Sequence, residues 1–139
     1  MAMNQHNQAA MDLIKRQEGL RLKPYRDTEG VLTIGYGRNL EEGITLEEAA
    51  FLFLNDFYRA QGTVMNLFPD WVEWDEQRLS AMISMMYNLG LPRFLTFEKM
   101  IAAIEAGDWA RAAAEMRDSK WFKQVPERVD ELAGMVHRK

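Results

Sequence analysis

The sequence contains no cysteine, only two histidines and four prolines among its 139 residues. Without cysteine, neither a disulfide framework nor a thiolate metal site is possible. The histidines, His6 and His137, lie near opposite ends of the chain, so we expect no histidine metal site and no cofactor. No apolar run is long enough to span a bilayer, and we therefore expect no insertion into a membrane.

The first ten residues, MAMNQHNQAA, lack the basic start and apolar stretch of a signal peptide. We expect the product to begin in the cytoplasm of the cell that makes it. A formal net charge of −4 gives no broad attraction for nucleic acid. The length fits one domain acting as a monomer, with a core filled by its ten methionines and four tryptophans.

Most of the chain has the apolar spacing of amphipathic helices. Thr45 and Glu48 form a predicted capping box, and Asp75, Thr96 and Asp108 are further predicted N-caps. Gly19 is the predicted stop of the first helix. The spacing predicts helices over residues 7–18, 45–67, 75–89, 96–106, 108–117 and 127–136.

Residues 18–40, EGLRLKPYRDTEGVLTIGYGRNL, depart from the helical pattern. Because side chains alternate between the two faces of a strand, Leu32 and Ile34 would share one face and Thr33 would lie on the other. The preceding residues, DTEG, are of types that favour a turn. This segment predicts a small hairpin or short sheet inside a mostly helical chain, which makes the fold class α+β.

Two carboxylates and one hydroxyl make this segment a candidate catalytic site. Glu18 lies at a helix end close to the apolar stripe, where partial desolvation favours a neutral, proton-donating carboxyl group. Asp27 lies in a polar turn and is expected to stay ionised, with the Thr33 hydroxyl holding a water beside it. An acid, a base and a held water are what glycosidic hydrolysis requires.

The stretch EGLRLKPYRDTEGVLTIGYG resembles the catalytic segment of phage lysozymes of glycoside hydrolase family 24. The family pattern is Glu, eight residues, Asp, five residues, Thr, and Glu18, Asp27 and Thr33 meet it. The resemblance implies a muramidase that cuts the β-1,4 bond between N-acetylmuramic acid and N-acetylglucosamine in bacterial peptidoglycan. It implies Glu18 as the general acid and Thr33 as the residue that positions water. Asp27 matches the acidic partner that either activates the water as a base or stabilises the developing cation, and we expect the base role. The resemblance resumes in MMYNLG, GDWARAA and SKWFKQVPER.

The resemblance also implies a single catalytic domain with two lobes and a cleft between them. A small β-containing lobe is expected over about 19–60, followed by a helical lobe over about 61–139 that includes the N-terminal helix. A long helix connects the two. Four residues match the family's substrate-binding positions, namely Tyr87, Asn88, Trp121 and Gln124.

Arg38 stands where many members of that family have a histidine. The family histidine pairs with an aspartate on the next helix, and Asp56 occupies the matching place. We therefore predict an ion pair between Arg38 and Asp56.

Three alternative functions are a peptidoglycan-binding module without activity, a lytic transglycosylase and a lytic domain of a phage tail. Retention of Glu18, Asp27 and Thr33 disfavours the first, and the paired Asp27 and Thr33 disfavour the second. The absence of flanking segments favours a free endolysin over the third. We expect such an endolysin to be located in the host cytoplasm before its release to the cell wall. We also expect it to hydrolyse the glycosidic bond with inversion of configuration.

Overall fold

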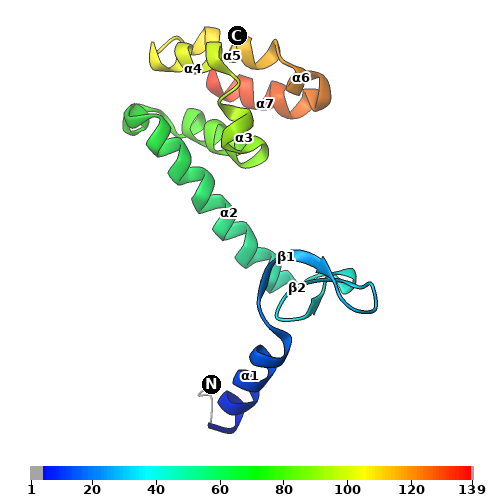
Figure 1. Ribbon diagram of the computed structural model, residues 1–139. Coiled ribbons are helices and arrows are strands. Elements are labelled where there is room, and N and C mark those ends of the chain that lie inside the picture. The colour runs from blue at the N-terminus through cyan, green and yellow to red at the C-terminus, as the bar shows by residue number, and fades with distance from the viewer. Residues whose placement is uncertain (1–4, 139) are drawn as a thin grey trace. The chain divides into compact units, whose positions relative to one another are not determined.

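The computed structural model describes residues 5–138 and has the expected mostly helical α+β fold (Figure 1). A small antiparallel sheet follows the first helix, and helices make up nearly all of the rest. The first part of the chain contains α1 (Gln5–Glu18), β1 (Arg21–Arg26), β2 (Leu32–Gly35), β3 (Arg38–Asn39) and a 3-10 turn, η1 (Leu40–Glu42). The remainder contains α2 (Leu46–Leu67), a 3-10 turn η2 (Pro69–Glu73), α3 (Glu76–Phe94), α4 (Glu98–Glu105), α5 (Trp109–Arg117), α6 (Lys120–Gln124) and α7 (Pro126–Val136).

The chain divides into two compact units, the first ending at Ala50 and the second beginning at Phe51. In the first unit, α1 stops as predicted, because Gly19 takes a left-handed φ of 73° and donates its N–H to the Lys15 carbonyl. The strands follow in the order β1-β2-β3, so β2 is the central strand. Thr33 of β2 accordingly pairs with a residue on each side.

Burial within the first unit is confined to one side chain. Among residues 7–50, only Thr33 is buried, with 4% of its surface exposed. Residues 7–50 therefore form no hydrophobic core of their own, although apolar burial is the main driving force for folding. Hydrogen bonds at turns and helix ends fix its local geometry instead.

The predicted capping box begins α2. The N–H of Thr45 donates to Oε1 of Glu48 at 2.9 Å, and the N–H of Glu48 donates to Oγ1 of Thr45 at 3.1 Å. Nη1 of Arg38 donates to the same Oε1 at 2.8 Å, and its Nη2 contacts the other oxygen. The predicted pair between Arg38 and Asp56 is therefore wrong, because Glu48 on the first turn of α2 binds the guanidinium. The Asp56 carboxylate instead lies 3.9 Å from Nη1 of Arg59.

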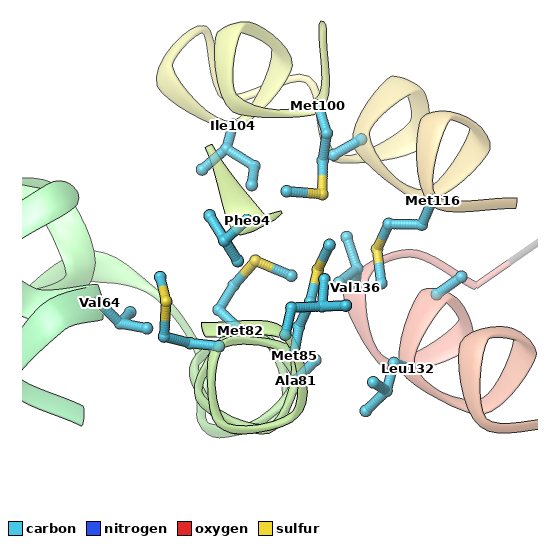
Figure 2. Packing of buried hydrophobic residues seen from close by; sticks show 14 of the residues in the cluster. Val64, Ala81, Met82, Met85, Phe94, Met100, Ile104, Met116, Leu132 and Val136 are labelled. Atoms are coloured by element: carbon cyan, nitrogen blue, oxygen red, sulfur yellow. The ribbon is translucent and has the colours of Figure 1, made fainter. Parts of the chain in front are cut away.

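The second unit contains the hydrophobic core, and methionine fills much of it (Figure 2). Met82 and Met85 of α3, Met100 of α4 and Met116 of α5 are all fully buried. The flexible thioether chain suits the irregular space between several short helices. Buried residues of α7 complete the cluster on another side, namely Val129, Leu132, Ala133 and Val136.

Helix boundaries in the second unit follow the predictions closely, with two exceptions. Asp75 and Asp108 cap their helices, accepting the N–H groups of the residues three positions on at 2.8 and 3.1 Å. Thr96 does not cap α4, because its hydroxyl donates to the Arg93 carbonyl at 2.6 Å. The sequence also did not predict α6, whose five residues are too few to show a helical period. No helix within residues 5–138 combines the length and apolar character needed to cross a bilayer.

The long predicted helix over 75–89 ends where expected. Gly90 has a φ of 77° and a ψ of 163°, which interrupts α3 and starts a separate short turn that contains Pro92. The candidate binding residues Tyr87 and Asn88 therefore lie in the last turn before this break.

The pair between Arg38 and Glu48 predicts a specific dependence of stability on pH. Hydrogen bonds from the Arg38 side chain and then from the Thr45 backbone lower the pKa of Glu48 from 4.5 to about 2. Because the folded pKa is depressed, the stabilisation is fully present above 4.5 and is lost as the pH falls toward about 2. Arg38→Met should raise the pKa of Glu48 and flatten the fall in unfolding free energy across this window.

NMR titration of the Glu48 carboxyl carbon, combined with urea unfolding at several acidic pH values, measures both effects. Arg59→Met serves as the control, because it removes the cation near Asp56 and leaves Glu48 untouched. An identical Glu48 titration in the wild type and Arg38→Met would contradict the assigned pair.

Candidate active site

Glu18 is the last residue of α1 and is exposed. The partial desolvation expected from the sequence is therefore not supplied by the first unit. The turn that joins β2 to β3 lies against this end of the helix. Gly37 of that turn contacts the Glu18 carboxyl group, and the ammonium group of Lys15 lies 5.4 Å from the centre of the Tyr36 ring.

Asp27 directly follows β1 and opens the predicted turn. Its Oδ1 accepts the N–H groups of Glu29 and Val31, both at 2.9 Å. Its own N–H donates to the Val31 carbonyl at 3.0 Å, and its carbonyl accepts the Gly30 N–H at 2.9 Å. Within the described residues 5–138, no protein group donates a hydrogen bond to Oδ2, so this oxygen is available to a water molecule.

Thr33 lies in the middle of the sheet, and its hydroxyl donates to the Val31 carbonyl at 2.8 Å. A hydroxyl that donates its only hydrogen still has lone pairs that accept one. A water beside Thr33 would therefore donate to it. The side chain is 4% exposed, so solvent reaches little of its surface.

The backbone of Val31 connects two of the three candidate catalytic residues. Its N–H and carbonyl both bind Asp27, and its carbonyl also accepts the Thr33 hydroxyl. Glu18 is attached to the same hairpin through the turn at its other end. The first unit thus carries two carboxyl groups and a hydroxyl on a shared hydrogen-bonded frame, which suits acid–base chemistry on a bound substrate.

All four predicted binding residues belong to the second unit, and three of them, Asn88, Trp121 and Gln124, lie near one another. Nε1 of Trp121 donates to Oδ1 of Asn88 at 3.0 Å, and the Trp121 ring stands edge-on to Phe97. Gln124 accepts a long hydrogen bond of 3.5 Å from Arg93. Trp121 and Gln124 line a cavity of about 600 Å³, although Trp121 is itself 3% exposed and packs mainly in the core.

Tyr87 faces a different cavity, of about 270 Å³, which it shares with Asp56 and Arg59. Its ring centre lies 5.8 Å from that of Phe53 on α2. The structure therefore brings Asn88, Trp121 and Gln124 together and places Tyr87 in a separate depression.

Sequence reasoning did not identify Val31 or Gly37 as parts of the site, nor Arg93 and Ser119 as neighbours of the larger cavity. Val31 acts through backbone groups, which carry no sequence signal. Ser119 did carry a sequence signal, because a serine before a helical run is a typical N-cap. In the structure its Oγ accepts the Phe122 N–H at 3.1 Å. Over residues 5–138, no group of three or more histidine, aspartate or glutamate side chains is placed to hold a metal ion.

The two hydrogen bonds to Oδ1 predict that Asp27 has a structural role separable from its chemistry. Asp27→Asn keeps an acceptor oxygen at this position, so the turn should remain closed. Asp27→Ala removes the acceptor and should lower the unfolding free energy by about 1–2 kcal/mol. Urea unfolding and hydrogen exchange at the Glu29 and Val31 amides measure the difference. Equal protection of both amides in the two variants would show that these bonds do not hold the turn.

Comparison with known proteins gives a consistent match over almost the whole chain. A sequence model described as phage lysozyme matches residues 15–139. The pre-baseplate central spike protein Gp5 of Enterobacteria phage T4 is 30% identical over 94% of this chain, which spans 28% of that protein. Probable T4-type lysozyme 1 of Dictyostelium discoideum is 30% identical, covering 90% of this chain and 91% of its own. An endolysin of Acyrthosiphon pisum secondary endosymbiont phage 1 is 33% identical over 91% of this chain and 87% of its own.

Proposed function

The chain belongs to the phage lysozyme family, and we propose that it cuts the β-1,4 bond between N-acetylmuramic acid and N-acetylglucosamine in bacterial peptidoglycan. It is a glycoside hydrolase, and we propose an endolysin that is made in the host cytoplasm and acts on the wall after release. The main observation in support of the proposal is the hydrogen bonding of the Asp27 carboxylate. Two backbone N–H groups fix one oxygen, and no group within residues 5–138 donates a hydrogen bond to the other. The Thr33 hydroxyl is linked to Asp27 through the Val31 carbonyl, which accepts hydrogen bonds from both residues.

In the proposed reaction, Glu18 acts as the general acid. It gives its proton to the glycosidic oxygen, so the leaving sugar departs as a neutral alcohol. The exposed position of Glu18 at the end of α1 leaves it accessible to a polymeric substrate. Positive charge then develops on the anomeric carbon of the remaining sugar.

Asp27 and Thr33 act together on the attacking water. The water donates one hydrogen to the free Oδ2 of Asp27 and the other to the Thr33 hydroxyl oxygen. This arrangement aims an oxygen lone pair at the anomeric carbon, and Asp27 takes up the proton as the new bond forms. Attack from the face opposite the leaving group inverts the configuration.

The second unit supplies proposed substrate contacts. Trp121 and Gln124 offer an aromatic edge and an amide beside the larger cavity, and Asn88 is fixed by its bond from Trp121. Such a mixture of apolar surface and few polar groups is typical of binding pockets. Tyr87, with 44% of its surface exposed, is proposed to contact a more distant part of the glycan strand.

Product analysis distinguishes hydrolysis from the alternatives. Digestion of purified peptidoglycan in ¹⁸O-labelled water should place the label in the new reducing ends, as read by mass spectrometry. A lytic transglycosylase would give unlabelled anhydro products, and a binding module would give none. NMR of the first anomer formed tests inversion, and a retained configuration would refute the water-activating role of Asp27.

A second candidate rests on the similarity to the phage T4 spike protein, of which this chain spans 28%. In that case the chain would be the lytic domain of a structural protein. Finding the polypeptide in purified phage particles would favour this candidate. Finding it only in the soluble fraction of lysed cells would favour the endolysin.

Glu18→Gln should abolish lysis while leaving the fold intact, because the amide is nearly isosteric but has no proton to give. General acid catalysis contributes about 10²–10⁴-fold, and the rate on purified cell walls should fall by that amount. Glu41→Gln is the matched control, since Glu41 is another exposed glutamate of the first unit. A Glu18→Gln rate close to that of the control would remove Glu18 from the mechanism.

Thr33→Val should also reduce the rate strongly, whereas Thr33→Ser should retain most of it. Valine preserves the shape of the buried side chain and removes the hydroxyl that orients water, while serine keeps the hydroxyl. Turnover of cell walls by both variants, with urea unfolding to correct for stability, measures this role. If valine and serine reduced kcat equally, the hydroxyl would have no part in orienting the water.

A further inference from the structure

Gly37 differs from the other glycines of the first unit in what a Cβ atom at its position would contact. A Cβ built on Gly37 would lie 2.5 Å from Oε2 of Glu18, 2.9 Å from Cδ and 3.4 Å from Cγ. The same construction at Gly19, Gly30, Gly35 and Gly43 meets nothing within 4 Å. The Glu18 carboxyl group therefore occupies the space that any side chain at position 37 would need.

A second contact holds the same helix end to the same turn. The Lys15 ammonium group lies 5.4 Å from the centre of the Tyr36 ring, within the range of a cation–π attraction. Lys15 and Glu18 are three residues apart and so share one face of α1. This face rests on two consecutive residues, Tyr36 and Gly37, which fixes the orientation of the carboxyl group about the helix axis.

The turn is itself anchored to the strand that carries Thr33. β2 and β3 pair Ile34 with Arg38 and Thr33 with Asn39, and Gly37 immediately precedes the first of these pairs. The contact with Gly37 thus relates the position of Glu18 to that of Thr33 through a short hydrogen-bonded hairpin.

We propose that Gly37 is a positioning residue for Glu18, because its bare Cα provides the surface against which the acid is held. The inference rests on the proposed role of Glu18 as the general acid. A methyl group at position 37 would force Oε2 to move by most of an ångström to reach an ordinary contact of 3.4 Å. A misplacement of about 1 Å costs about 10²-fold in rate.

Gly37→Ala and Gly35→Ala form a matched pair. Both glycines have left-handed backbones, with φ of 78° for Gly37 and 70° for Gly35, so both substitutions strain the backbone of the same hairpin. Only alanine at position 37 meets Glu18. Gly37→Ala should lower kcat by about 10²-fold with KM little changed, whereas Gly35→Ala should lower stability and keep kcat. Equal kcat in the two variants would overturn the proposal.

A readout that does not need activity separates this inference from the proposed function. The ¹³Cδ resonance of Glu18 should shift in Gly37→Ala and remain in place in Gly35→Ala. In unfolding experiments, Glu18→Ala should relieve part of the damage in Gly37→Ala and none in Gly35→Ala. If Glu18→Gln stays active while this coupling is found, the contact stands and the assignment of the acid fails. Absence of both the shift and the coupling rejects the contact.

If alanine at position 37 prevents folding, Gly37→Asn and Gly35→Asn replace the pair, since asparagine tolerates the left-handed region better. The expected order is the same, with kcat reduced only at position 37. An unfolded Gly37→Asn beside a folded Gly35→Asn would support a clash at position 37, and refolding on addition of Glu18→Ala would assign that clash to Glu18. Failure of Glu18→Ala to restore the fold would overturn the proposal.

Discussion

The backbone of Val31 is the point on which the arrangement of the candidate catalytic groups depends. Its N–H and carbonyl bind Asp27 from both directions, and the carbonyl also accepts the Thr33 hydroxyl. Because Thr33 is the one buried residue among positions 7–50, hydrogen bonds rather than apolar packing fix this end of the hairpin. In the second unit apolar packing has this role instead, because Trp121 is part of the packed core and its Nε1 binds Asn88.

Much of the fold could be predicted because the deciding signals are local. The end of α1 at Gly19 and the capping box of Thr45 and Glu48 are each settled by groups within four residues of one another. The same holds for the caps at Asp75 and Asp108. The spacing of the two carboxylates and the threonine in residues 18–40 also indicated the lysozyme family, and the family match agrees with that indication. The strands of the small sheet lie in the same segment.

The remaining features depend on which parts of the chain meet in space. The partner of Arg38 was mispredicted because β3 brings it to the first turn of α2, where Glu48 already accepts the Thr45 N–H and still has capacity for a cation. The exposure of Glu18 and its contact with Gly37 follow from how a turn and a helix end meet. The spacing of residues in the sequence predicts neither the exposure of Glu18 nor its contact with Gly37. The role of Val31 could not be predicted either, because it depends on backbone groups that nearly all residues have.

The methionine core has a consequence for the redox behaviour of the protein. With ten methionines and no cysteine, thioether is the only form of sulfur in the chain. Met82 and Met85 are fully buried, whereas Met11, Met65 and Met135 are partly exposed and are, among residues 7–138, the methionines that an oxidant in solution meets first. Sulfoxide formation turns a flexible apolar side chain into a polar one. Among the described methionines, mild oxidation therefore falls on these partly exposed side chains, and the core sulfurs react only when local opening admits the oxidant.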